Sequence, residues 1–322
     1  MILRYESYTK VLISMFLTTI FGAVIYSYFF IQNYPIPITN RISLDAKIGF
    51  IKNRVDRDRV DTIIVGSSIG LNNVAGEVLE KSSKIIDGVL NLSVYEATSP
   101  QIEQVLELTP LFPNLKRVIY SAQFSDFAYA GRLKDFDSRF IIDYISGNLS
   151  IKDITSFYFR SCQNIFFCIK RQWSWGREHQ NSNQFTYLGF DKTGSVPLGI
   201  YGDDIIKSRW ENPHSDRESD YAFRALDEIA KKLKEKRIKL IFVMQPYREP
   251  LVKKFKHLKP TMERFESRVK SILDRSGGEF LNLHKRLHLK DIYFADRSHL
   301  NSKGAVISSG EIAKFIDREV KR

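Results

Sequence analysis

The stretch that decides the fold is DTIIVGSSIG, residues 61–70. Its four β-branched residues, 62–65, are typical of a short buried strand, and the glycine and serines that follow are typical of a tight turn. Open α/β sheets bind ligands beyond the carboxyl ends of their strands, where this turn would lie. A helix starting there would offer free N–H groups and the positive end of its dipole to a developing oxyanion. A serine in this turn is therefore a candidate nucleophile, the alternative being an ordinary Ser/Gly turn.

A second stretch near the other end of the chain offers the partners that such a serine needs. Residues 293–301 read YFADRSHLN and precede the last expected helix. A nucleophilic serine requires a base, and the base requires an orienting group. Asp296 and His299 stand three residues apart, so the carboxylate can reach the near ring nitrogen while the far nitrogen faces a serine. The alternative is a surface aspartate beside an incidental histidine, since the chain has six histidines.

These motifs together resemble the SGNH (GDSL-type) hydrolases. Residues 66–68, Gly-Ser-Ser, resemble block I with Ser68 at the nucleophile position, and residues 296–299 resemble block V. Residues 91–93 resemble the approach to block II, and residues 118–124 the strand that leads to block III. The resemblance extends over roughly residues 58 to 320 and is closest to membrane-anchored SGNH-like proteins of bacterial envelopes, some of which take part in acylating surface polymers. It implies a Ser68–His299–Asp296 triad.

Two positions depart from the family pattern. Glu96 or Ala97 stands where block II has a glycine whose N–H helps to form the oxyanion hole, and Gln123 stands where block III has an asparagine. Glutamine still donates a side-chain hydrogen bond, one methylene further out, so the resemblance implies Gln123 as an oxyanion donor. The departures leave the triad positions intact. They also keep open a catalytically degenerate accessory or scaffold protein.

A second serine-hydrolase pattern fits the same turn. Gly66-x-Ser68-x-Gly70 matches the nucleophile elbow of the α/β-hydrolases. Those enzymes place the acid and the histidine on separate loops after a mid-chain serine. Here the serine follows the first strand and one turn carries both partners, so the order favours the SGNH interpretation.

Strand and helix patterns alternate along the rest of the chain, which predicts an α/β fold. The expected strands are residues 62–65, 89–92, 117–122, 239–245 and 279–282, and the expected helices are 100–108, 219–236, 261–276 and 302–320. We expect a three-layer α/β/α sandwich with a five-stranded, mostly parallel sheet of the SGNH/flavodoxin-like type. Gln245 and Tyr247, at the end of the fourth strand, are weak candidates for substrate contacts.

An apolar segment precedes this domain. Residues 11–31 are long enough to span a bilayer as a helix, and no charged residue lies between Lys10 and Arg41. We expect one uncleaved transmembrane helix; the alternative is a cleaved signal peptide. Arg4 and Lys10 favour a cytoplasmic N-terminus of residues 1–10, a linker at 32–59, and a domain at 60–320 that faces the periplasm or the exterior.

An aromatic-rich insertion is expected at about residues 127–217. It holds all three tryptophans, Trp173, Trp175 and Trp210, which would either stack on sugar rings or pack a small core of the insertion itself. Cys162 and Cys168 are the only cysteines, and the sequence leaves a disulfide and two buried thiols equally open. Two cysteines do not make a zinc site.

The net charge and the motifs limit the classes of partner that we expect. The formal net charge is +12, yet no nucleic-acid-binding motif accompanies it, so we expect membrane headgroups and anionic glycans rather than nucleic acid. A serine triad requires no cofactor and no metal. The resemblance implies an esterase or O-acyltransferase that acts through an acyl-enzyme on an acylated glycan, with a membrane-bound acyltransferase as a further partner. The alternative is the scaffold protein named above.

Overall fold

The domain is built on one parallel sheet. A computed structural model describes residues 2–33, 38–39, 41–134, 136–153, 156–157, 189–205, 210–212 and 217–319. Its strands are β1 (Thr62–Gly66), β2 (Val89–Asn91), β3 (Arg117–Ala122), β4 (Lys239–Met244) and β5 (Glu279–Asn282). They lie in the order β2-β1-β3-β4-β5, and every neighbouring pair is parallel. The predicted five-stranded sheet is confirmed.

Side chains alternate between the two faces of the sheet, as period-two patterning requires. On β1, Ile63 and Val65 belong to the larger core cluster, whereas Ile64 belongs to the cluster on the opposite face. On β4, Phe242 and Val243 divide in the same way. Both faces are therefore buried, which explains why these strands are almost continuously apolar.

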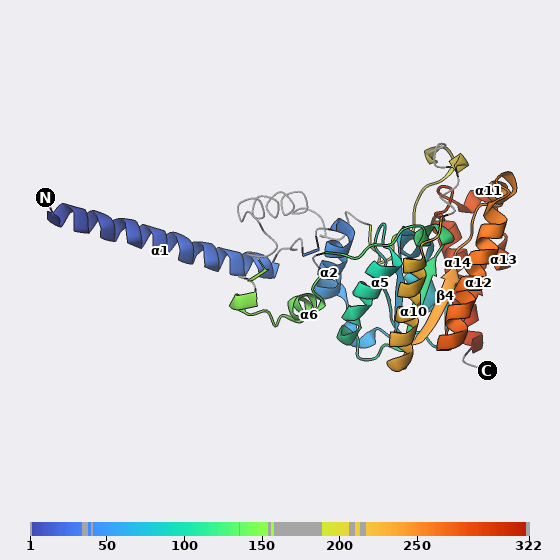
Figure 1. Cartoon of the computed structure of the whole chain (residues 1–322), viewed down its shortest axis with the longest axis horizontal. Coiled ribbons are helices and arrows are strands. Elements are labelled where there is room, and N and C mark those ends of the chain that lie inside the picture. Colours follow the sequence, from blue (N-terminus) through green and yellow to red (C-terminus); the bar gives the residue numbers. More distant parts are fainter. Residues whose placement is uncertain are drawn as a thin grey trace.

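Helices cover both faces and complete the predicted three-layer α/β/α sandwich. One layer holds α5 (Ser99–Val105), α10 (Asp220–Glu235) and α12 (Leu258–Ser276), and Figure 1 shows these three in front of the sheet. The other holds α3 (Ser68–Asn73), α4 (Gly76–Ser82), α13 (Leu283–Leu287) and α14 (Ser302–Glu319). Two further helices are α6 (Ser138–Ser146) and α11 (Glu249–Lys254). The described 3-10 turns are η1 (Arg57–Arg59), η2 (Leu106–Leu111), η3 (Phe124–Phe127), η5 (Gly202–Asp204) and η6 (Asp291–Tyr293).

The N-terminal helix α1 (Ile2–Asn33) extends away from the domain in Figure 1. Its segment Tyr5–Ile25 is long and apolar enough to cross a membrane, and none of that segment is buried against the protein. A signal sequence near an N-terminus has the same length and composition. The structure thus places one apolar helix where the sequence predicts an anchor.

A helix occupies much of the predicted linker. Residues Ile42–Arg54 form α2, and its Leu44, Ile48 and Ile51 are buried in the larger core cluster. This packing places α2 against the domain, inside the segment predicted as a linker at residues 32–59. Its Lys47 is also buried.

The described end of the predicted insertion packs along the domain. The Asn91 N–H donates to the Thr193 carbonyl, and the Val196 N–H donates to the Leu71 carbonyl. Trp210 packs against a small cluster of Leu289, Phe294 and Leu300. It fills space in the protein, which favours the packing alternative for this tryptophan. Trp173, Trp175, Cys162 and Cys168 lie outside the described residues.

Candidate active site

The candidate nucleophile lies where the strand order reverses. Strand β1 pairs with β2 on one side and β3 on the other, and in such sheets the crevice at this reversal is the usual ligand site. Gly66 ends β1, and a Cβ at this position would collide with the Ser121 carbonyl oxygen, so only glycine allows the close approach to β3. Ser67 caps α3 by accepting the Ile69 N–H at 3.1 Å. These contacts place Ser68 in the first turn of α3, partly exposed.

The three residues predicted as a triad meet at this edge. His299 Nε2 lies 2.8 Å from Ser68 Oγ, and His299 Nδ1 lies 2.8 Å from Asp296 Oδ2. With Nδ1 protonated, His299 donates to the carboxylate and accepts from the serine, which is the tautomer that a general base needs. The His299 and Asp296 side chains are each 19% exposed, so the pair is screened from water but open on one side.

Electrostatics hold Asp296 ionised. Burial alone would raise the pKa of Asp296, but the hydrogen bond and charge of His299 and the two backbone N–H donors hold it well below its ordinary value. Those donors are the N–H groups of Ser298 and His299, at 2.9 and 2.8 Å from Oδ1. A carboxylate in this state orients the imidazole and stabilises the imidazolium that forms when the base takes a proton.

Asn73 clamps the histidine turn from the far end of α3. Its Oδ1 accepts the Leu300 N–H at 2.8 Å, and its Nδ2 donates to the Ser298 carbonyl at 3.2 Å. The side chain is fully buried. One short helix therefore carries Ser68 at its start and the support of His299 at its end. In the sequence, the signal for this role is the pair of amides Asn72-Asn73, in a segment otherwise made of apolar and small residues.

Gln123 is placed differently from the expectation for an oxyanion donor. Its Nε2 donates to the Pro246 carbonyl at 2.6 Å and to the Ser298 carbonyl at 3.3 Å. Both amide hydrogens are thus engaged with main-chain carbonyls, and the side chain is fully buried. In this arrangement Gln123 supports the turn that carries His299 and presents no free donor to Ser68. The extra methylene relative to asparagine gives it the reach to do so.

Gln245 and Tyr247 do not line the crevice as weak substrate contacts would. Gln245 is fully buried, its Nε2 donating to Ser121 Oγ and its Oε1 accepting from Ser308 Oγ. Tyr247 is 5% exposed and stacks on Phe124 with ring centroids 4.8 Å apart. Both side chains point into the protein, because the chain turns inward after β4 to meet α14 and η3.

The turn after β2 keeps the backbone shape that a glycine would provide. Glu96, one of the two residues aligned with the block II glycine, has φ of +57°. This left-handed conformation costs nothing for glycine and about 1–2 kcal/mol for other residues. The turn is anchored next to the nucleophile, since the Val94 N–H donates to the Gly66 carbonyl. Glu96 therefore holds a left-handed backbone conformation that glycine adopts without strain.

Substitution of Glu96 tests this strain. We expect Glu96→Val to lower the free energy of unfolding by about 1–2 kcal/mol, because a β-branched side chain resists positive φ. Glu96→Gly should stay within about 1 kcal/mol of the parent, since relieved strain offsets the freedom glycine adds to the unfolded chain. Chemical denaturation of the detergent-solubilised protein measures both. Equal losses in the two variants would show that the left-handed turn is not what matters at this position.

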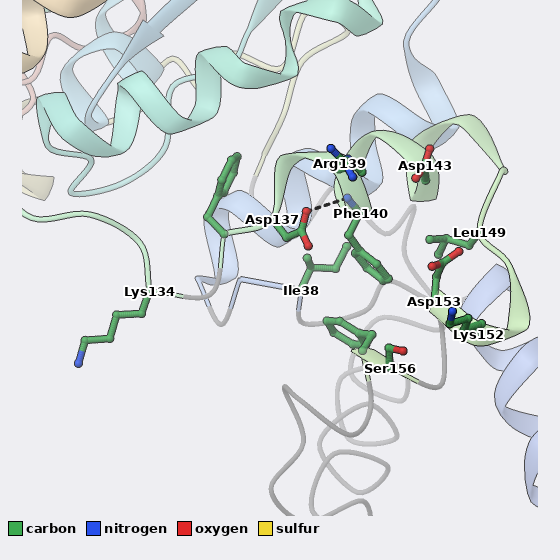
Figure 2. A pocket seen from close by; sticks show the side chains of 12 residues that line it. Ile38, Lys134, Asp137, Arg139, Phe140, Asp143, Leu149, Lys152, Asp153 and Ser156 are labelled. Carbon is green, nitrogen blue, oxygen red and sulfur yellow. Dashed lines mark hydrogen bonds between the residues drawn. The ribbon is translucent and has the colours of Figure 1, made fainter.

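Other features of the described residues lie away from this crevice. No group of three His, Cys, Asp or Glu side chains placed to hold a metal ion occurs among them. A hollow of about 410 Å³ lies beside α6, with Ile38 and Phe140 in its wall (Figure 2). No triad residue lines it.

Comparisons with known proteins were made for the whole chain. No protein-family model and no curated protein matches it. Among solved structures it is similar to a GDSL-like lipase from Bacteroides thetaiotaomicron, at 12% identity and a TM-score of 0.38, covering 83% of this chain and 92% of the other. It is also similar to a catalytic mutant of an acetylxylan esterase from Geobacillus stearothermophilus, at 12% identity and a TM-score of 0.39, covering 80% and 94%.

The chain is similar in fold to GDSL-type hydrolases. At these identities and TM-scores the likeness assigns no activity to it. Any activity therefore depends on the side chains that this chain itself places around Ser68.

Proposed function

We propose that this protein is a membrane-anchored SGNH-like serine esterase or O-acyltransferase that acts on ester-linked acyl groups of an envelope or extracellular polysaccharide. The observation that carries the proposal is the chain of two 2.8 Å contacts from Ser68 through His299 to Asp296. Nothing in the packing of the described residues requires this geometry, whereas nucleophilic catalysis does.

The chemistry follows from the order of these contacts. Ser68 Oγ forms a bond to the acyl carbon while its proton passes to His299 Nε2. The tetrahedral intermediate collapses, the ester C–O bond breaks, and His299 returns the proton to the departing sugar oxygen. A water or a second hydroxyl then attacks the acyl carbon and gives its proton to His299. The bond between the acyl carbon and Ser68 Oγ breaks, His299 passes that proton to Ser68 Oγ, and the acid or the new ester leaves. Asp296 remains ionised throughout and stabilises the imidazolium.

The substrate and location in this proposal have separate support. The carbohydrate ester comes from the sequence resemblance to membrane-anchored SGNH-like proteins of bacterial envelopes. The anchor is the apolar helix that includes Tyr5–Ile25. Arg4 and Lys10, at its N-terminal end, favour a domain on the outer side. A net charge of +12 suits an anionic glycan or membrane surface.

A fluorophosphonate that cannot cross membranes tests chemistry and location together. We expect it to label the full-length protein on spheroplasts or intact cells, to modify Ser68 in peptide mapping, and to be blocked by acylated glycans. Labelling only after lysis would contradict the outward-facing domain. No labelling in either preparation would overturn the enzyme and favour a scaffold that binds an acyltransferase. Acyl release measured over a panel of acetylated glycans then identifies the substrate.

A further inference from the structure

A half-buried carboxylate outside the triad contacts the residue that precedes the nucleophile. Asp126, in η3, accepts the Ser67 hydroxyl on Oδ1 at 2.6 Å and the Gln123 N–H on Oδ2 at 2.7 Å. Ser67 directly precedes the candidate nucleophile, and Gln123 directly follows β3. Asp126 therefore joins the two chain segments on either side of the crevice.

Through Gln123 the connection continues to the histidine turn. The same residue that donates its N–H to Asp126 uses its side-chain amide to hold the Ser298 carbonyl, next to His299. A continuous path of hydrogen bonds thus runs from the residue before Ser68 to the residue before His299. The path contains no triad side chain, so it can fix the separation of nucleophile and base without taking part in proton transfer.

Ser67 forms two hydrogen bonds at the start of this path. Its Oγ accepts the Ile69 N–H and donates to Asp126, so both its hydrogen-bonding roles are used. A serine that lacks the carboxylate could rotate to another staggered position and release the cap of α3. Because α3 is only six residues long, the loss of its cap would shift Ser68 directly.

We propose that Asp126 is a positioning residue that locks the Ser67–Ser68 turn to the end of β3 and so holds Ser68 Oγ within reach of His299. The kinetic part of this inference rests on the proposed function, whereas the structural part does not. A misplacement on the order of 1 Å at a reacting atom can lower a rate about a hundredfold, so a positioning role of this kind is measurable.

The surroundings of Asp126 give a pH signature. Burial raises the pKa of Asp126 to about 6, against the opposing effects of the Ser67 and Gln123 hydrogen bonds and the charge of His299. The groups that face it are His299 before α14, the Tyr120 phenol of β3 and the Tyr247 phenol after β4. Below that pH the protonated carboxyl carries no negative charge, so its bonds to the Ser67 hydroxyl and the Gln123 N–H lose their charge assistance.

The test compares Asp126→Asn, Ser67→Ala and the double variant in the full-length protein. With the fluorophosphonate probe we expect each single variant to label Ser68 about tenfold more slowly. We expect the double variant to be no slower than the slower single one, because both remove the same contact. Additive losses, or labelling of Asp126→Asn at the parent rate, would overturn the proposal.

Amide hydrogen exchange tests the same proposal without relying on activity. A peptide covering residues 66–73 should exchange roughly tenfold faster in Asp126→Asn, since the α3 cap is loosened. Unchanged exchange in this peptide would contradict the positioning role, whether or not the protein is an enzyme. If the probe does not label the parent protein at all but Asp126→Asn alters exchange as expected, the proposed function would be wrong and the positioning role of Asp126 would stand.

Asp61→Asn is the matched control. Asp61 is more deeply buried than Asp126 and lies at the opposite end of β1, where it accepts the Thr62 hydroxyl at 2.7 Å and pairs with Arg117 at 3.1 Å. We expect it to lower stability without faster exchange in residues 66–73 and without slower labelling. Equal acceleration in both variants would mean that general destabilisation, not positioning, explains the result.

The pH signature adds a last readout. The folded protein holds the Asp126 proton up to about pH 6, whereas the ordinary pKa is 3.8. The stabilisation from this proton is therefore complete below about pH 4 and lost as the pH rises through about 6. Unfolding curves of Asp126→Asn should lack that slope. A slope identical to that of the parent would show that Asp126 does not titrate there and would contradict a carboxylate held away from water by its bonds to Ser67 and Gln123.

Discussion

Ser68→Ala is expected to lower esterase activity by roughly four to six orders of magnitude, with the fold unchanged. The Ser68 hydroxyl contacts only His299 among the described hydrogen bonds, so its removal takes away the nucleophile and leaves the packing intact. Hydrolysis of an aryl acetate and labelling with a fluorophosphonate measure the loss, and circular dichroism checks the fold. Residual activity within about a hundredfold of the parent would show that Ser68 is not the nucleophile.

Two further variants test whether this loss comes from the triad. Ser67→Ala should cost only about tenfold, because Ser67 positions the turn and forms no bond to substrate. His299→Ala combined with Ser68→Ala should cost little more than either change alone, since members of a triad act as a unit. If the two losses multiplied, the residues would serve different steps.

Asn73→Ala is expected to have the largest effect on stability, about 2–4 kcal/mol. The change leaves the buried Leu300 N–H without its partner and removes one of the two donors to the Ser298 carbonyl. Each buried group left unpaired costs about 1–3 kcal/mol. The value of kcat should also fall, by roughly tenfold or more, because the turn that carries His299 loosens. Denaturant titration and steady-state kinetics measure the two effects.

The neighbouring amide is the control. Asn72 is also buried on α3, but its Oδ1 has no hydrogen-bond partner in the described part of the chain. Asn72→Ala should therefore lower stability much less and leave kcat near that of the parent. If Asn72→Ala and Asn73→Ala behaved alike, loss of side-chain volume rather than loss of the clamp would explain both.

Local patterns were sufficient for the framework of the domain. The β-branched run at residues 62–65 could only be a short buried strand, and the alternation of such runs with helical periods requires a parallel sheet with helices on both faces. The edge of such a sheet pointed to Ser68. Asp296 and His299 were predicted as its partners from their spacing before the last helix and from the resemblance of residues 296–299 to block V of the SGNH hydrolases. In the structure, two hydrogen-bonding contacts join these three side chains.

Those patterns did not predict the direction in which individual side chains point. Gln123, Gln245 and Tyr247 all follow strands at the correct edge, yet all three are buried and point into the protein. A strand end fixes where the backbone stops, but neighbouring elements decide which way the next side chains turn. For Gln123 the deciding neighbours are the Pro246 and Ser298 carbonyls, which come from distant parts of the chain.

The sequence by itself determined the layered α/β/α fold and the apolar N-terminal helix, because these depend on periodicity along the chain. It also pointed to the three candidate catalytic residues, through their spacing and the resemblance of residues 66–68 and 296–299 to the SGNH hydrolases. Only the tertiary structure decided the roles of Asn73, Gln123 and Asp126 and the packing of α2. Each of these depends on contacts between residues distant in sequence, such as the 225-residue separation between Asn73 and Ser298. Buried polar groups must find partners wherever the fold provides them, and no local pattern records which partner that will be.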